Sequence, residues 1–218
     1  MPFKSLQNDI LLPPDLTTWQ WLFETPTYSP LYRFPQNELA GYHNAVTKET
    51  LNWQQVKEVS TYLSTALVKN YGLREGDTVS LFSQNTIWYP IAMHATLRVG
   101  GKVSGASPAY NVEEMTYALE KADAKFIFTH PNSMEVATKA ADKAGVKREN
   151  LFLLEGEMEG YKTIQELIEE GKKAGEQVPY FKIPKGKTNF DVCGFLSFSS
   201  GTTGLPKAVR VLNSTGDT

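Results

Sequence analysis

The feature that most constrains the fold is a regular alternation of strand-like and helix-like stretches along most of the chain. Short runs rich in β-branched and apolar residues, which are typical of strands, fall at residues 45–48, 50–53, 78–83, 102–107, 125–130, 151–154 and 192–199. Helical periodicity fills residues 53–71, 87–99, 112–122 and 133–144, and another helix begins after residue 163. This alternation, without internal repeats, predicts an α/β fold with a layered, mostly parallel sheet and flanking helices.

Polar residues mark where several of these helices begin. Asn111 and Glu114 have the spacing of a capping box, in which each side chain binds the backbone N–H of the other residue, and so do Thr163 and Glu166. Asn85 is expected to cap the helix over residues 87–99. These positions predict the starting points of three of the flanking helices.

Composition restricts the class of function. The 218 residues include 22 basic and 24 acidic side chains, and a formal net charge of -2 lacks the positive footprint of a dedicated nucleic-acid binder. The single cysteine, Cys193, cannot form an internal disulfide, and the three histidines lack metal-ligand spacing, so no metal-binding residue is assigned. No stretch is apolar enough for a signal peptide or a membrane span, which favours a cytoplasmic protein.

The clearest functional signal is the stretch that follows the last predicted strand. Gly201 and Gly204 lack a Cβ, so backbone N–H groups beside them can approach an anion closely. Four hydroxyl groups add donors, and Lys207 adds a positive charge. This set suits a polyphosphate, and parallel sheets bind ligands beyond the carboxyl ends of their strands. The candidate nucleotide-binding residues are Ser199, Ser200, Gly201, Thr202, Thr203, Gly204 and Lys207.

Other interpretations of this stretch fit less well. A flexible Gly/Ser/Thr linker would seldom begin directly at the end of an apolar strand and close on Pro-Lys. A Walker A loop needs its lysine directly after a glycine and a Ser or Thr after the lysine, whereas Pro206 precedes Lys207 and Ala208 follows it. A dinucleotide fingerprint of the G-x-G-x-x-G type does not follow the first strand.

The motif "SSGTTGLPKAV" resembles the phosphate-binding signature of the AMP-forming adenylate enzymes, which include acyl-CoA synthetases, 4-coumarate–CoA ligases and luciferases. Weaker likenesses extend this resemblance over residues 25–210, and it is closest to the fungal 4-coumarate-ligase-like acyl-CoA ligases of secondary metabolism. It implies that the complete enzyme binds ATP with Mg²⁺, converts a carboxylic acid to an acyl-adenylate and passes the acyl group to CoA. The loop would clamp the β- and γ-phosphates, and Lys207 would offset charge on the departing pyrophosphate.

The end of the chain departs from the family pattern. Where the family places a Ser/Thr-His pair, this sequence has Asn213 in place of the histidine, and the family's acyl pocket and adenylation lysine do not occur in these 218 residues. We therefore expect a truncated N-terminal portion of an acyl-CoA ligase that is inactive alone and has no catalytic residue of its own. It would comprise an N-terminal wrapping segment (1–40), a partial AMP-binding domain (41–210) and a divergent tail (211–218).

An alternative is a non-catalytic nucleotide-binding or protein-interaction module. In either case the ligands would be ATP or AMP, with a carboxylic acid and CoA as partners of full-length relatives, some of which would carry a peroxisomal address. Neither nucleic acid nor a membrane is an expected partner. Exposed sheet edges predict self-association.

Overall fold

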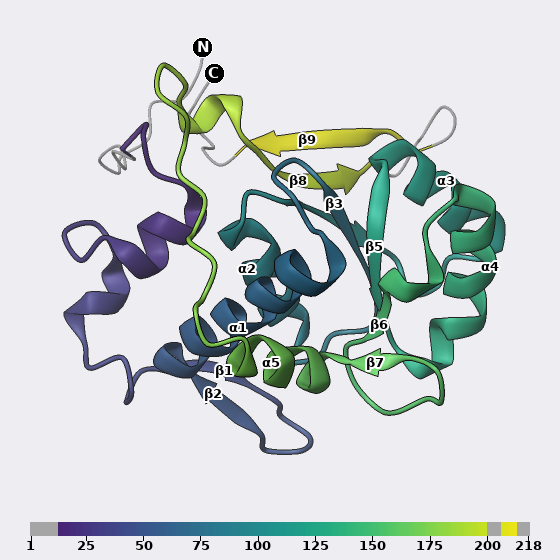
Figure 1. Ribbon diagram of the computed structural model, residues 1–218, viewed down its shortest axis with the longest axis horizontal. Helices are drawn as coiled ribbons and strands as arrows, with labels where there is room; N and C mark the ends of the chain where they lie inside the picture. The colour runs from purple at the N-terminus through teal and green to yellow at the C-terminus, as the bar shows by residue number, and fades with distance from the viewer. Residues whose placement is uncertain (1–12, 200–205, 213–218) are drawn as a thin grey trace, which may run out of the picture.

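The computed structural model of the chain describes residues 13–199 and 206–212. Within them, seven strands form one sheet that lies between two groups of helices, as predicted (Figure 1). The strands are β3 (Thr78–Phe82), β4 (Lys102–Ala106), β5 (Ala124–Thr129), β6 (Leu151–Leu153), β7 (Lys162–Thr163), β8 (Cys193–Phe198) and β9 (Ala208–Leu212). Their spatial order is β7-β6-β5-β3-β4-β8-β9. Neighbouring strands are parallel except for β8 and β9, which form an antiparallel hairpin.

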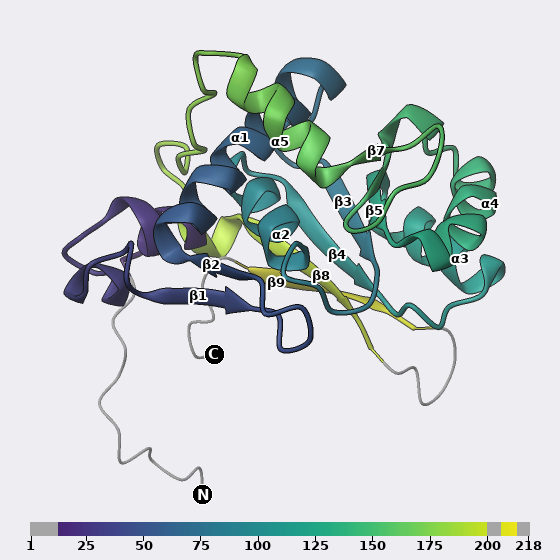
Figure 2. The same cartoon turned by 90° about the horizontal axis from the view of Figure 1, so that it is seen from below.

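Helices cover both faces of the sheet. The helices are α1 (Trp53–Tyr71), α2 (Tyr89–Arg98), α3 (Val112–Ala122), α4 (Met134–Ala144) and α5 (Ile164–Lys173), with a π-helix at Gln20–Glu24 and 3-10 turns at Pro30–Arg33, Pro131–Ser133, Arg148–Asn150 and Asn189–Asp191. Helices α1, α2 and α5 pack on one face, and α3 and α4 pack on the other (Figure 2). None of the helices in the described part of the chain has the length and apolar character needed to cross a bilayer.

Both predicted capping boxes are confirmed. The Glu114 N–H donates to Asn111 Oδ1 at 3.0 Å, and the Asn111 N–H donates to Glu114 Oε2 at 2.9 Å. At the start of α5, the corresponding bonds between Thr163 and Glu166 measure 3.2 and 2.7 Å. Each box satisfies two backbone N–H groups that the first helical turn leaves without partners.

Two clusters of apolar side chains hold the layers together. Val79 and Leu81 of β3 face the first group of helices, whereas Phe82 of the same strand faces α3 and α4. Strand β3 is buried along its whole length, because it lies between β4 and β5 and is covered on both faces. A strand buried on both faces is typical of a parallel sheet with helices on each side.

The strand predicted at residues 45–48 is wrong, because this segment forms a turn. Asn44 Oδ1 accepts hydrogen bonds from the N–H groups of Val46 and Thr47 at 2.9 and 3.1 Å. Lys48 then has a positive φ of 65°. The asparagine side chain replaces the strand's ladder partners and reverses the chain. The turn joins β1 (Ala40–His43) to β2 (Thr50–Asn52), which pair antiparallel in a separate two-stranded sheet.

The prediction that Asn85 caps α2 is also wrong, because the helix begins at Tyr89 and no side chain of the described residues caps it. The N–H of Trp88, the residue before the helix, donates to Thr86 Oγ1 at 3.3 Å. Pro90 lies in the first turn, where its missing N–H costs no helical hydrogen bond. A helix that began two residues earlier would bring the Pro90 ring against the carbonyl of Thr86.

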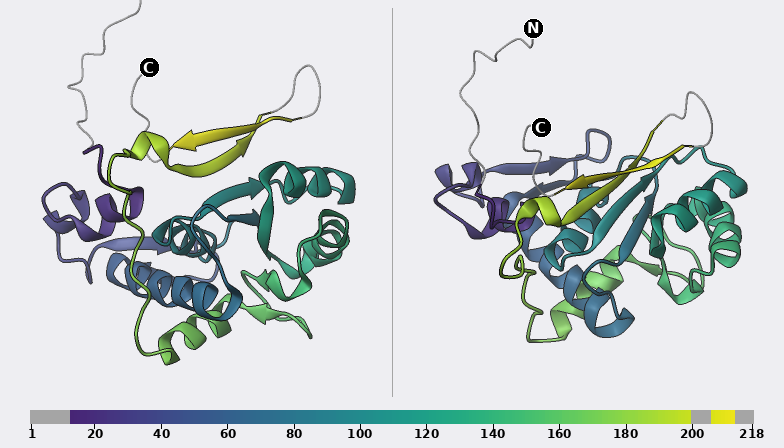
Figure 3. Two further views of the ribbon diagram at one scale, coloured as in Figure 1. Left: turned by 45° about the horizontal axis from the view of Figure 1, so that its top comes forward. Right: turned by 90° about the horizontal axis from the view of Figure 1, so that it is seen from above.

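The N-terminal segment and the connection after α5 run side by side along the edge of the helical layer (Figures 1 and 3). Trp19 and Phe23 of the N-terminal segment are buried in the core cluster that includes α1 and α2. In the connection, Asn189 binds the N-terminal segment through its backbone N–H, which donates to the Pro14 carbonyl at 2.7 Å. The chain therefore returns to β8 over a surface that the N-terminal segment helps to form.

His94 is buried in α2 among aromatic rings. Its Nε2 lies 2.9 Å from the hydroxyl of Tyr42, and the rings of Phe23 and Trp53 lie 5.4 and 6.3 Å from the imidazole. Burial lowers the pKa of His94 from its ordinary 6.5 to about 4. The imidazole therefore stays neutral at pH 7 and serves as a packing residue that joins β1 to α2.

We predict that Gly171→Ala destabilises the protein. A Cβ at this position of α5 would overlap the backbone carbonyl oxygen of Tyr62 in α1. Alanine in place of a helical glycine normally stabilises by about 1 kcal/mol. Overpacking costs about 1–3 kcal/mol, and a clash with backbone lies at the upper end of that range, so we expect a net loss of about 2 kcal/mol in urea unfolding. Gln165→Ala, on the exposed face of α5, is the control; equal stabilities for the two variants would contradict this prediction.

The second prediction concerns pH. The folded chain binds a proton at His94 less readily than the unfolded chain does. The free energy of unfolding therefore has its full value above pH 6.5, where His94 is neutral in both states, and it decreases as the pH falls towards 4. Between pH 7 and pH 5, the wild-type free energy of unfolding should fall by about 2 kcal/mol more than that of His94→Gln. His43→Gln, at an exposed imidazole, is the control. An equal change of slope in both variants would rule out His94 as the source.

Candidate functional site

The hairpin of β8 and β9 brings the two ends of the predicted phosphate loop together. The Ser199 N–H donates to the carbonyl of Lys207 at 3.0 Å, and the Lys207 N–H donates to Ser199 Oγ at 3.2 Å. Ser199 and Lys207 therefore lie opposite each other where the strands end. The other candidate residues lie outside the described part of the chain: Ser200, Gly201, Thr202, Thr203 and Gly204.

We call the hydrogen-bonded pair of Ser199 and Lys207 the hairpin neck. Its hydrogen bonds leave two groups available to an anion. Ser199 Oγ accepts from a backbone N–H, and its own O–H proton has no acceptor among the described residues. The Lys207 side chain is exposed, and no carboxylate of the described residues lies within ion-pair distance of it. A hydroxyl donor and an uncompensated ammonium at the neck of one hairpin suit a phosphate group.

The neck lies at the carboxyl ends of the parallel strands, where the sequence predicts the ligand. Strands β3 and β8 both run parallel to their common neighbour β4, so their carboxyl ends point the same way (Figure 2). The connections after β3 and β4 lead to helices on opposite faces, α2 and α3. Ligands of open α/β sheets bind at such an edge, where neighbouring connections diverge.

Tyr117 is a neighbour of this site that sequence analysis missed. It lies on α3, and its hydroxyl donates to the carbonyl of Pro206 at 2.9 Å, across a separation of 89 residues. The periodicity of α3 predicts which side chains enter the core, and Tyr117 is only partly buried. No local signal in the sequence links this tyrosine to the loop.

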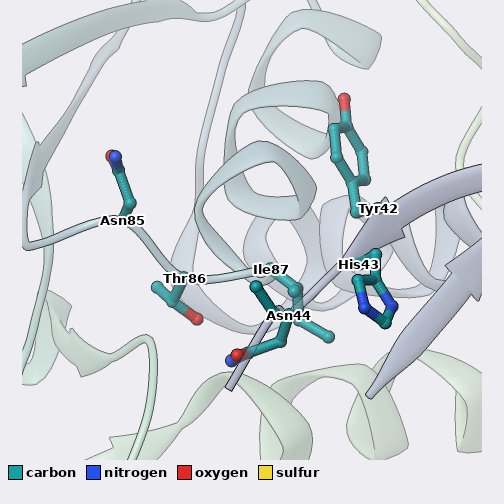
Figure 4. Close-up of a pocket in the computed structure, with 7 residues that line it drawn as sticks. Tyr42, His43, Asn44, Asn85, Thr86 and Ile87 are labelled. Atoms are coloured by element: carbon teal, nitrogen blue, oxygen red, sulfur yellow. The ribbon is translucent and has the colours of Figure 1, made fainter. Parts of the chain in front are cut away.

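A second feature of this edge is a cavity of 270 Å³ between the turn after β1 and the segment after β3 (Figure 4). The side chains of Asn44 and Thr86 extend in the same direction, whereas the Tyr42 ring points away from them towards His94 (Figure 4). The cavity is lined by Tyr42, His43, Asn44, Ala45, Asn85, Thr86 and Ile87. These described residues include no lysine, arginine or carboxylate, so the hairpin neck suits a polyphosphate better than this cavity does.

Two of the solved structures that share this fold are described by their likeness to the chain. An anthranilate CoA ligase in complex with anthranoyl-AMP has a TM-score of 0.74 and 20% identity, over 93% of this chain and 36% of that one. A luciferase-like enzyme from the Zophobas morio mealworm has a TM-score of 0.73 and 22% identity, over 95% of this chain and 46% of that one. These likenesses establish a shared fold.

Curated proteins with similar sequences include CoA ligases. Phenylacetyl-CoA ligase of Aspergillus niger is 28% identical over 198 residues, which cover 87% of this chain and 34% of that ligase. For 4-coumarate–CoA ligase 1 of Petroselinum crispum, the identity is 26% over 209 residues, 96% of this chain and 35% of that ligase. The chain spans about a third of the length of these relatives. A family model described as AMP-binding enzyme matches residues 32–213, and the chain therefore belongs to the AMP-binding enzyme family.

Proposed function

We propose that this chain supplies the triphosphate-binding part of an acyl-CoA ligase, an enzyme that activates a carboxylic acid with ATP and transfers the acyl group to CoA. The observation that carries the proposal is the paired neck of Ser199 and Lys207 at the carboxyl end of β8. Support for the reaction class comes from the similar phenylacetyl-CoA and 4-coumarate–CoA ligases.

In this proposal ATP, accompanied by Mg²⁺, supplies the activated phosphorus that the carboxylate attacks. Ser199 and the loop after it would donate hydrogen bonds to the β- and γ-phosphates. The Lys207 ammonium would offset the negative charge that develops on pyrophosphate as it departs. Groups positioned before the reaction stabilise such charge without reorganising, which is how most phosphoryl and nucleotidyl transfer is accelerated.

We further propose that the 218 residues bind nucleotide but by themselves complete neither formation of the acyl-adenylate nor transfer of the acyl group to CoA. Support comes from the share of the relatives that the chain spans, about a third. Release of pyrophosphate from ATP by the purified chain, in the presence of phenylacetate or 4-coumarate, would overturn this part of the proposal. Saturable nucleotide binding without any such release is also what a non-catalytic binding module would show.

The proposed division of the chain keeps its boundaries at residues 40 and 210. Burial of Trp19 and Phe23 against α1 and α2 supports a role for residues 1–40 as a segment that wraps the sheet domain. Strand β9 runs across the second boundary as far as Leu212, and the family match extends to residue 213. Asn213, where the family pattern has a histidine, lies outside the described residues.

The first prediction of this proposal is that Lys207→Ala weakens binding of MgATP. Loss of a charge-assisted contact to phosphate should reduce affinity by about tenfold or more, measured by isothermal titration calorimetry. Lys172→Ala is the control, because it removes the same charge from an exposed position on α5. Identical titrations for wild type and Lys207→Ala would show that the lysine does not contact the nucleotide.

The second prediction concerns the proposed self-association through sheet edges. Within the described residues, β9 forms one edge of the sheet, and the exposed Arg210 lies in its middle. A charge in an edge strand opposes pairing with a second copy, because like charges would meet across the new ladder. Arg210→Val should therefore increase self-association with concentration in sedimentation velocity. Lys185→Val, which removes an equal charge outside the strands, is the control, and equal association of both variants would contradict the role of Arg210.

A further inference from the structure

Tyr117 makes a contact that only the tertiary structure provides. Its hydroxyl donates to the carbonyl of Pro206, the residue directly before Lys207. Proline has no backbone N–H, so the carbonyl is the one polar backbone group through which residue 206 can be held. The hairpin's own hydrogen bonds at this point join the backbone of Lys207 to the N–H and the Oγ of Ser199 instead.

We propose that Tyr117 is a positioning residue that sets the place of Lys207 relative to bound phosphates. This inference rests on the proposed function of the hairpin neck and adds a residue to it from a different element of the fold. Tyr117 does not touch the nucleotide itself. It acts by fixing the backbone from which the lysine side chain extends.

The helix that carries Tyr117 is a rigid support. The capping box at Asn111 holds its first turn, and Met115 and Leu119 are fully buried against the sheet. At its other end, the Ala122 carbonyl accepts a hydrogen bond from Thr78 Oγ1 at 2.7 Å, which ties α3 to the central strand β3. Because both ends of α3 are held in this way, the position of Tyr117 on the helix is fixed relative to the sheet.

The strand on the other side of the contact is held much less firmly. β9 pairs only with β8 in the described part of the chain, and Val209 is half exposed. The hydrogen bond from Tyr117 thus joins a fixed element, α3, to a weakly packed one, β9, at the residue before the proposed phosphate-binding lysine.

The Tyr117 ring is itself restrained, because the Lys121 ammonium lies over its face, 5.5 Å from the ring centre.

Tyr117→Phe tests the inference, because it removes the hydroxyl and keeps the ring. Tyr161→Phe is the matched control, since the Tyr161 hydroxyl is also partly buried and bonds to Thr138 Oγ1 at 3.0 Å, away from the hairpin. Two quantities would be measured on the 218-residue chain: amide hydrogen exchange at Ser199 and Lys207, and the affinity for MgATP. Thermal unfolding of both variants would be recorded beside them.

We expect exchange at the Ser199 and Lys207 amides to become faster in Tyr117→Phe and to stay unchanged in Tyr161→Phe. The affinity for MgATP should fall by about threefold to tenfold in Tyr117→Phe alone, the factor that one hydrogen bond supplies. The two variants should unfold at similar temperatures, since each loses one partly buried hydroxyl. A merely structural role for Tyr117 would change stability without this selective loss of affinity.

Two results would overturn the inference. One is unchanged amide exchange at Lys207 in Tyr117→Phe, and the other is faster exchange with no loss of affinity. If the wild-type chain does not bind MgATP, the proposed function of the isolated chain fails, and the exchange rates alone decide whether Tyr117 holds the hairpin neck.

Discussion

The structure depends on the burial of one positive charge, the guanidinium of Arg98 at the end of α2. Its Nη1 donates to Ser64 Oγ at 3.0 Å and its Nη2 to the Val178 carbonyl at 2.7 Å, and the Trp19 ring lies 5.6 Å away. No carboxylate among the described residues forms an ion pair with it, and burial lowers the pKa of the guanidinium below its ordinary value. A buried cation without these partners would cost several kcal/mol. Arg98 therefore holds together the segments that carry Ser64, Val178 and Trp19.

The contacts of Arg98 matter to the candidate site because they hold the segment through which the chain returns after α5. The carbonyl of Arg98 also accepts a hydrogen bond from the Phe181 N–H at 2.7 Å. The connection held in this way leads to β8, which pairs with β4 although β5, β6 and β7 lie between them in the chain. The position of β8 decides where the hairpin neck lies.

The sequence predicts local features well and long-range features poorly. The capping boxes at Asn111 and Thr163 were confirmed because each is complete within four residues. The prediction for residues 45–48 failed because the side chain of Asn44 outweighs the strand preference of its neighbours. The prediction for Asn85 failed because Pro90 restricts where α2 can begin. In both failures a single residue's hydrogen bonding or ring geometry overrode the average preference of the segment.

By itself, the sequence determined the type and approximate bounds of most elements, the class of fold and the set of functional groups between Ser199 and Lys207. These follow from periodicity and from functional groups that are adjacent in the chain. The tertiary structure alone decided the strand order, the antiparallel return of β9 and the contact between Tyr117 and Pro206. Such features join residues far apart in the chain, and no local spacing encodes which distant surfaces meet, because packing of the whole core selects that arrangement.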